Sequence, residues 1–266
     1  MGETMNIKIF IVTYNSPHRI NTCLKSLFED TDYPLDGSVN VISNHTNHGI
    51  SDSYLNRINL YENTCRPDWS TGHLSRSWNQ CYLHGFKSLT NPDCDALLMV
   101  QDDTLFQDNF YKISCGLLQD YDMVQQGHGD ACMLVTPELI RHVGIWDERF
   151  CQSRHAADYF WRCIMHRKEK SSFSDTIHKR IWQPIGQWEL IKPESRDIAE
   201  NHFFPSSTED QTISSKLMNM KYEFDPFPWT DEKISKSPKR TMIENYIYYP
   251  YFEKDIYNLR DKGYVV

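Results

Sequence analysis

The sequence of 266 residues has no apolar run long enough for a membrane helix. About 20 consecutive apolar residues are needed to cross a bilayer, and no stretch of the chain approaches that length. The first apolar segment also begins without the charged and apolar regions that make up a signal peptide. We therefore expect a soluble, cytoplasmic protein with no membrane span.

Two other patterns are missing. There is no run of basic residues, and the formal net charge is −8 with a pI near 5.7, so the sequence lacks the positive patch that nucleic-acid binding requires. The eight cysteines form no Cys-x-x-Cys pair and follow no regular spacing. We interpret them as reduced thiols, which excludes a zinc site and a disulfide framework as organising features.

The most informative stretch that is present spans residues 96–106 and reads Ala-Leu-Leu-Met-Val-Gln-Asp-Asp-Thr-Leu-Phe. Its apolar half predicts a strand buried on both faces, and Asp102 and Asp103 follow that strand directly. Neighbouring carboxylates disfavour each other's ionisation, so this acidic pair needs cations, donors or water. Mg²⁺ or Mn²⁺ often fills that need and brings phosphate oxygens with it. The alternative is that the pair begins a turn and caps a helix predicted over 107–121.

Polar residues also follow two earlier predicted strands, over 6–13 and 39–43. An apolar helical stripe over 17–28 lies between them, and Ser16 or Asn15 is a suitable cap for that helix. Strand, helix and strand in this order predict a parallel pair, and ligands of parallel sheets bind beyond the carboxyl ends of the strands. The residues expected there, beside the acidic pair, are Thr13, Tyr14, Asn15 and Asn44.

The rest of the core reads as alternating short elements. We predict helices from residue 72 to about 89 and over 137–143, and strands over 122–126 and 131–136. Residues 50–70 have weak periodicity and are predicted to be irregular. A glycine on each side of His128 suggests that the backbone there comes close to another group.

The order of several motifs resembles the nucleotide-sugar glycosyltransferases of the GT-A fold, most closely the large inverting family 2. The motifs are Ile-Val-Thr-Tyr-Asn-Ser-Pro near the start, Gly-His-Leu-Ser-Arg-Ser-Trp-Asn, Leu-Met-Val-Gln-Asp-Asp-Thr, Val-Gly-Ile-Trp-Asp-Glu-Arg-Phe and Ala-Asp-Tyr-Phe-Trp-Arg. The resemblance covers roughly residues 5–167. It implies an α/β core over residues 1–170, with a mixed, mainly parallel central sheet flanked by helices. A mostly irregular or helical extension, 171–266, would pack on this core at the acceptor side or at an oligomer contact.

The resemblance also implies a donor site. Mn²⁺ or Mg²⁺ would hold the diphosphate of a UDP- or GDP-linked sugar at the Asp-x-Asp position, which Gln101, Asp102 and Asp103 cover here. Because the first member is Gln, we assign Asp103 as the metal ligand and Asp102 to ribose or metal. By the same resemblance, Thr13, Tyr14 and Asn15 form the first nucleotide-binding loop, Asn44 faces the base, Arg76 and Asn79 contact the donor from a helix, and His202 is a further metal ligand. The alternative for His202 is simple packing among aromatic residues.

An inverting reaction needs a base that takes the proton of the acceptor hydroxyl. Alignment on Asp-x-x-x-Arg places Asp158 at the second acidic position of the family motif and Ala156 where the base would stand. We assign Asp158 as the base and His155 as the second candidate. The alternative for Asp158 is an ion pair with Arg162 one helical turn later.

The sequence therefore predicts a metal-dependent glycosyltransferase that transfers a sugar, with inversion, from a nucleoside-diphosphate sugar to a glycan, a glycosylated molecule or another hydroxyl acceptor. A homodimer is compatible with its aromatic C-terminal third. Two alternatives remain. One is a non-catalytic GT-A-like module that binds a nucleotide or glycan, which Ala156 would favour. The other is a nucleotidyltransferase, although Tyr-Asn-Ser-Pro after the first strand lacks the glycines of a triphosphate loop.

Overall fold

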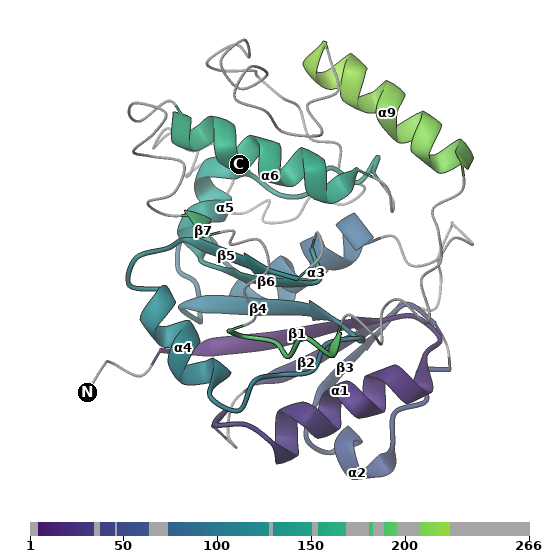
Figure 1. Cartoon of the computed structure of the whole chain (residues 1–266), viewed down its shortest axis with the longest axis vertical. Helices are drawn as coiled ribbons and strands as arrows, with labels where there is room; N and C mark the ends of the chain where they lie inside the picture. The colour runs from purple at the N-terminus through teal and green to yellow at the C-terminus, as the bar shows by residue number, and fades with distance from the viewer. Residues whose placement is uncertain are drawn as a thin grey trace.

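The computed structural model describes residues 5–34, 38–45, 47–63, 74–127, 130–150, 154–168, 181–182, 189–195 and 208–223. Its centre is a seven-stranded sheet with the order β3-β2-β1-β4-β6-β5-β7 (Figure 1). The strands are β1 (Ile7–Thr13), β2 (Val39–Ser43), β3 (Asn59–Glu62), β4 (Ala96–Gln101), β5 (Met123–Gln126), β6 (Cys132–Val135) and β7 (Ile181–Trp182). Only β6 is antiparallel to its neighbours. The mixed, mainly parallel α/β fold predicted from the sequence is confirmed.

Helices cover both faces of this sheet. They are α1 (Pro17–Glu29), α2 (Asp52–Leu55), α3 (Leu74–Phe86), α4 (Phe110–Leu117), α5 (Pro137–Val143), α6 (His155–Lys168) and α9 (Thr208–Tyr222). Side chains of α3, α5 and α6 pack against one face, and those of α1 and α4 pack against the other. Because side chains of a strand point alternately to opposite faces, β1 supplies Phe10 to the first core and Ile9 to the second. The apolar strands are buried on both sides, as their composition predicts.

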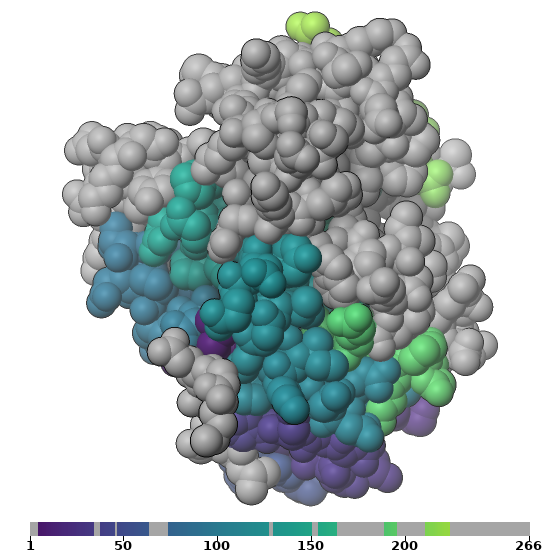
Figure 2. Space-filling model, turned by 60° about the vertical axis from the view of Figure 1, so that its left-hand side comes forward, coloured from purple at the N-terminus to yellow at the C-terminus, as the bar shows by residue number. Residues whose placement is uncertain are grey.

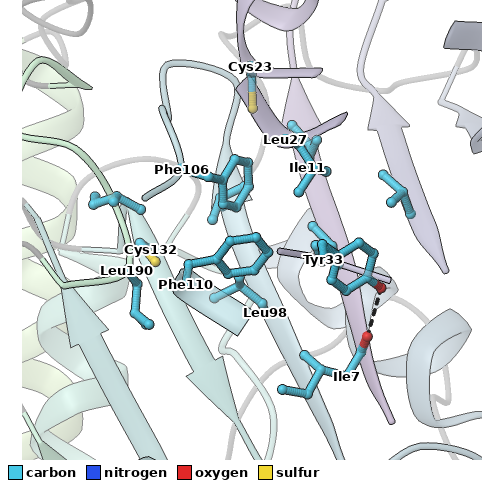
Figure 3. Packing of buried hydrophobic residues seen from close by; sticks show 14 of the residues in the cluster. Ile7, Ile11, Cys23, Leu27, Tyr33, Leu98, Phe106, Phe110, Cys132 and Leu190 are labelled. Atoms are coloured by element: carbon cyan, nitrogen blue, oxygen red, sulfur yellow. Dashed lines mark hydrogen bonds between the residues drawn. The ribbon is translucent and has the colours of Figure 1, made fainter. Parts of the chain in front are cut away.

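Figure 3 shows the second core at close range. Phe106 and Phe110 pack with their ring centroids 4.9 Å apart, and Tyr33 stacks beside Phe110 at 5.9 Å. The Tyr33 hydroxyl donates a hydrogen bond to the carbonyl oxygen of Ile7 at 2.8 Å, which satisfies the polar end of an otherwise apolar side chain. The residues that follow the acidic pair are therefore anchored in the core by aromatic packing.

The start of α1 is fixed by contacts that differ from those predicted. Ser16 is the N-cap residue, but its side chain makes no capping hydrogen bond; its Oγ accepts a hydrogen bond from Arg19 Nε instead. Gly49, in the loop after β2, has φ +62°, and a Cβ there would lie 2.4 Å from Pro17 Cγ. The loop after β2 thus packs directly on the first turn of α1 because residue 49 has no side chain.

Other differences from the sequence-based prediction involve short elements. Residues 50–70 were predicted to be irregular, but α2 and β3 lie within them; β3 has no buried residue, so it lacks the apolar pattern that marks a strand. The helix predicted over 107–121 spans only α4, and its N-cap is Asn109. The acidic pair therefore does not cap that helix. The predicted boundary between residues 170 and 171 stays a prediction.

Residues 189–195 lie against the segment that follows β4, as Figure 2 shows where green atoms meet teal ones. Phe106 and Ile191 form an isolated antiparallel bridge, and Lys192 N donates to Leu105 O at 2.7 Å. The hydroxyl of Ser195 accepts a hydrogen bond from Leu105 N at 2.9 Å. A late part of the chain thus holds the backbone just beyond the acidic pair.

Within the described ranges, no helix combines the length and the hydropathy needed to cross a bilayer. The cysteines of these ranges, Cys23, Cys81, Cys94, Cys115, Cys132 and Cys163, are all free thiols.

Candidate functional site

The ends of β1, β2 and β4 meet at one edge of the sheet. Thr13 pairs with Ser43, and Val12 pairs with Gln101. The backbone pairing continues past the strands, because Asn44 N donates to Thr13 O at 2.9 Å and Asp102 N donates to Val12 O at 3.1 Å. The polar exits of these three strands are therefore neighbours, as parallel pairing requires.

Asp102 is held by groups from β1 and α1. Its Oδ2 accepts a hydrogen bond from Thr13 Oγ1 at 2.6 Å, and its Oδ1 lies 3.2 Å from Arg19 Nε. Only 4% of its surface is exposed. Burial, with a smaller contribution from Asp103, raises the pKa of Asp102 to about 6, although Arg19, Thr13 and the backbone of Tyr14 act in the opposite direction. The charge of this carboxylate is thus only partly compensated.

Asp103 is half-buried, and among the described residues no side chain hydrogen-bonds its carboxylate. Burial raises its pKa, Arg19 opposes this rise and Asp130 adds to it. A divalent cation fits a carboxylate in this state, since Mg²⁺ and Mn²⁺ are commonly held by one or two carboxylates together with phosphate oxygens. The described residues contain no group of three His, Cys, Asp or Glu side chains that could hold a metal alone. The donor set fits a cation that arrives with a diphosphate.

The first loop, residues 14–16, borders the acidic pair. Asn15 is exposed with φ 44°, a left-handed conformation that asparagine tolerates better than most residues. Tyr14 is half-buried, and its ring meets the ring of His45 edge to face with centroids 5.7 Å apart. His45 follows Asn44 at the exit of β2 and was not singled out from the sequence. Tyr14, which contacts it, follows the end of β1.

Three residues that the family resemblance assigned to the sugar-nucleotide site are buried and hydrogen-bonded within the protein. Asn44 donates to Ser77 Oγ at 2.9 Å and accepts from Asn63 Nδ2 at 2.9 Å. Asn79 is fully buried; its amide donates to Trp146 O and to Glu148 Oε1 and accepts from Trp146 N. Arg76 is 7% exposed, with its Nε 4.0 Å from Glu148 Oε2. In this structure these side chains join α3 to neighbouring elements. Their contacts with a sugar nucleotide stay predictions.

Asp130 also lies at the edge of the sheet that carries Asp102 and Asp103, which we call the acidic edge. The sequence analysis did not identify Asp130 as a site residue. It lies two residues before β6, which runs antiparallel to β4. Its carboxylate therefore lies beside the end of β4, where Gln101 Nε2 is 3.5 Å from Asp130 Oδ1. Its Oδ2 lies 2.6 Å from Trp78 Nε1 and 2.7 Å from His155 Nε2. Burial opposes its ionisation, but His155 and Trp78 outweigh burial and lower the pKa of Asp130. The sequence analysis noted only the glycines on each side of His128 and assigned no role to Asp130.

Asp158 occupies a buried ionic cluster. Lys221 Nζ lies 2.7 Å and Arg162 Nη2 lies 3.1 Å from its carboxylate, and the Tyr222 hydroxyl donates to it at 2.7 Å. Lys221 Nζ also lies 2.8 Å from Asp147 Oδ2. Burial disfavours the charge of Asp158, yet Lys221 and Arg162 lower its pKa. The ion pair with Arg162 that we considered as the alternative for Asp158 is confirmed.

The structure thus brings together at the carboxyl edge the predicted residues Thr13, Tyr14, Asn15, Asn44, Gln101, Asp102 and Asp103 and adds Arg19, His45 and Asp130. His155 reaches this edge through Asp130, whereas Asp158 binds α9. His202 lies outside the described residues.

No protein-family model matches the chain, and no curated protein matches it. Solved structures do. TarS from S. aureus is 14% identical with a TM-score of 0.47, and the match covers 86% of this chain and 44% of the TarS chain. TarS 1–349 in complex with UDP-GlcNAc is 14% identical with a TM-score of 0.44, over 86% and 77% of the two chains. The mannosyltransferase PcManGT from Pyrobaculum calidifontis, in complex with GDP-Man and Mn²⁺, is 13% identical with a TM-score of 0.44, over 68% and 55%.

The chain spans less than half of the TarS chain that it matches. These identities and TM-scores are too low to carry a statement about function.

Proposed function

We propose that the chain is a glycosyltransferase that binds a UDP- or GDP-linked sugar together with Mn²⁺ or Mg²⁺ and transfers the sugar, with inversion, to a hydroxyl of a glycan or another acceptor. The observation that carries this proposal is the under-compensated acidic pair, Asp102 and Asp103, at the carboxyl edge of a mainly parallel sheet. Ligands of such sheets bind beyond that edge. A cation and a diphosphate would complete the charge balance there.

Asp103 is the first metal ligand in this proposal, because no described side chain competes for its carboxylate. Asp102 orients the site, since Thr13 and Arg19 hold both of its oxygens in place. A bound divalent ion would supply Lewis-acid stabilisation to the departing diphosphate. His202 keeps its predicted role as a further ligand. Tyr14 and His45 offer ring faces beside the acidic pair, where a nucleoside base could stack.

The choice of general base changes with the geometry. A base works best with a pKa near the working pH, and the pKa of Asp158 is lowered by Lys221 and Arg162. An imidazole is a common general base, and His155 is oriented by Asp130 through Nε2. We therefore propose His155 as the base and Asp158 as the second candidate. Release of Asp158 from its three partners would be needed for it to act.

Calorimetric titration with UDP- and GDP-sugars, each with and without Mn²⁺, tests the proposal. We expect one nucleotide series to bind, with an affinity that rises when Mn²⁺ is present. Hydrolysis or transfer of the bound sugar would then identify an enzyme. A protein that binds none of these donors under either condition contradicts the proposal.

The second candidate function is a GT-A-like module that binds a nucleotide or glycan without transferring it. Two observations favour it: Ala156 stands at the expected base position, and Asp158 is engaged in the ionic cluster. Such a module would bind a sugar nucleotide and leave it intact with every acceptor offered. Binding and turnover measured on the same preparation distinguish the two functions.

A further inference from the structure

Arg19 is a cationic side chain of the acidic edge to which the proposed function has not yet given a role in binding. It lies in the first turn of α1, with its side chain 12% exposed. Its Nε donates to Ser16 Oγ at 2.7 Å and lies 3.2 Å from Asp102 Oδ1. Within the described ranges, no lysine or other arginine forms an ion pair with either acid of the pair. Arg19 therefore places a positive charge next to the acidic pair.

The charges of the acidic pair and Arg19 do not balance. Asp102 and Asp103 carry two negative charges when ionised, and Arg19 carries one positive charge. A divalent cation reverses the sign, and the diphosphate of a sugar nucleotide, with two negative charges, then returns the total to about −1. A guanidinium beside the cation lets the edge hold a diphosphate more tightly than a cation alone would.

Arg19 also has N–H groups that its contacts to Ser16 and Asp102 do not use. A guanidinium carries five N–H groups in a planar fork that matches two oxygens of a phosphate. The contacts to Ser16 and Asp102 both use Nε, and the two Nη groups make no hydrogen bond to any residue in the described ranges. Ser16 and Asp102 hold Nε in place, so the orientation of the fork is set before a ligand arrives.

The position of Arg19 is fixed by the backbone as well. Pro17 packs on Gly49, whose missing side chain allows the contact, and Asn21 Nδ2 donates to Gly49 O at 2.8 Å. The first turn of α1 is therefore held against the exit loop of β2. A side chain in that turn keeps a constant distance from the ends of β1 and β2.

We propose that Arg19 is a donor-binding residue that contacts the diphosphate through its Nη groups while Nε remains on Ser16 and Asp102. This rests on the proposed function, because it assumes that a diphosphate binds at the acidic pair. It adds a residue that the family resemblance did not assign and makes α1 part of the phosphate-binding surface. The alternative is that Arg19 only neutralises Asp102. That role would require the positive charge of Arg19 but not the planar arrangement of its N–H groups.

The test compares the binding of uridine, UMP and UDP, repeated with the guanosine series, to wild type, Arg19→Gln and Arg19→Lys by calorimetry without metal and with Mn²⁺. We expect Arg19→Gln to weaken UDP or GDP binding roughly ten- to hundredfold, the size of a lost charge-assisted hydrogen bond, and to leave nucleoside binding unchanged. Arg19→Lys should recover only part of the loss, since a lysine cannot form the fork. Mn²⁺ alone should bind Arg19→Gln at least as well as wild type, because the edge becomes more negative.

Lys25→Gln is the matched control, since Lys25 is exposed on the same helix and the charge change is identical. It should bind every probe like wild type. Equal binding of UDP or GDP by wild type and Arg19→Gln overturns the role of Arg19 and leaves the proposed function standing. Full recovery by Arg19→Lys, or an equal loss for nucleoside and diphosphate, also overturns it. A wild type that binds no nucleotide overturns the proposed function itself.

Discussion

Tyr222, in the last turn of α9, donates its hydroxyl to Asp158 Oδ1 at 2.7 Å across 64 positions of the chain. Beside it, Lys221 lies within 2.8 Å of both Asp147 and Asp158. The side chains of Lys221, Asp147 and Asp158 are at most 4% exposed, and Tyr222 as a whole residue is 3% exposed. The end of α9 is thus docked on α6 by charges that have little contact with water, and their loss should be costly.

Replacing Lys221 by methionine should destabilise the protein by about 3–5 kcal/mol, because two buried carboxylates lose a shared cation. The free energy of unfolding, measured by urea titration, gives the result directly. Lys216→Met is the control: Lys216 is exposed on the same helix, and its loss should change stability by less than about 0.5 kcal/mol. Equal stability of the two variants would show that α9 does not depend on the cluster.

Asp147 makes the stability of the protein sensitive to acid. Burial disfavours its charge, but Arg149 and Lys221 lower its pKa from 3.8 to about 2. A lowered folded-state pKa stabilises the protein above the unfolded value, and this contribution is lost as the pH falls from about 4 towards 2. We expect Asp147→Asn to lose about 2 kcal/mol at pH 7 and to show a shallower decline in acid. Urea unfolding at a series of pH values measures both effects, and an unchanged acid slope would refute the assignment.

Asp103→Asn tests the metal ligand. The substitution keeps the size of the side chain but removes the charge, so Mn²⁺-dependent binding of the sugar nucleotide should weaken about 100-fold or more. Binding measured without Mn²⁺ should change much less, since the nucleoside does not depend on this carboxylate in the proposed site. An affinity for the Mn²⁺ complex equal to that of wild type would place the cation elsewhere.

His155→Gln and Asp158→Asn separate the two candidate bases. A base contributes roughly 10²–10⁴-fold to the rate, so the variant that removes it should lose that factor in kcat while donor affinity stays unchanged. We expect this of His155→Gln. We expect Asp158→Asn to lower the free energy of unfolding because it disrupts the cluster with Lys221. Full turnover in His155→Gln, with a large loss of kcat in a folded Asp158→Asn protein, would return the base to Asp158.

Two glycines give a paired test of the loop that seats α1. Gly49→Ala should destabilise the protein by about 1–3 kcal/mol, since φ +62° is strained for alanine and its Cβ would meet Pro17. Gly116→Ala should instead stabilise by about 0.5–1 kcal/mol, because Gly116 is helical and a Cβ there has nothing within 4 Å. Thermal unfolding of the two variants should shift in opposite directions, and shifts of the same sign would contradict this account of Gly49.

The fold and most of the acidic edge could be predicted because they depend on local patterns. Buried strands have continuous apolar runs, and parallel pairing brings Thr13 next to Asp102 whatever else the chain does. The pairing of Asp158 with Arg162 was also readable, since residues four apart on a helix are neighbours.

The rest depends on contacts that no local pattern contains. Asp130 reaches the edge because β6 runs against β4, and a four-residue strand does not show its direction in its sequence. Arg19 lies beside Asp102 and also donates to Ser16, whose side chain makes no capping hydrogen bond. Asn79 was assigned to the donor, yet its amide is fully used by the backbone of Trp146 and by Glu148.

The backbone beyond the acidic pair is held by Ser195, which lies 90 positions later than Leu105. During synthesis, the segment after β4 therefore leaves the ribosome long before the residues that fix it exist. Until residue 195 has emerged, a nascent or shortened chain therefore has the two carboxylates without the contact that Ser195 makes with the backbone beyond them.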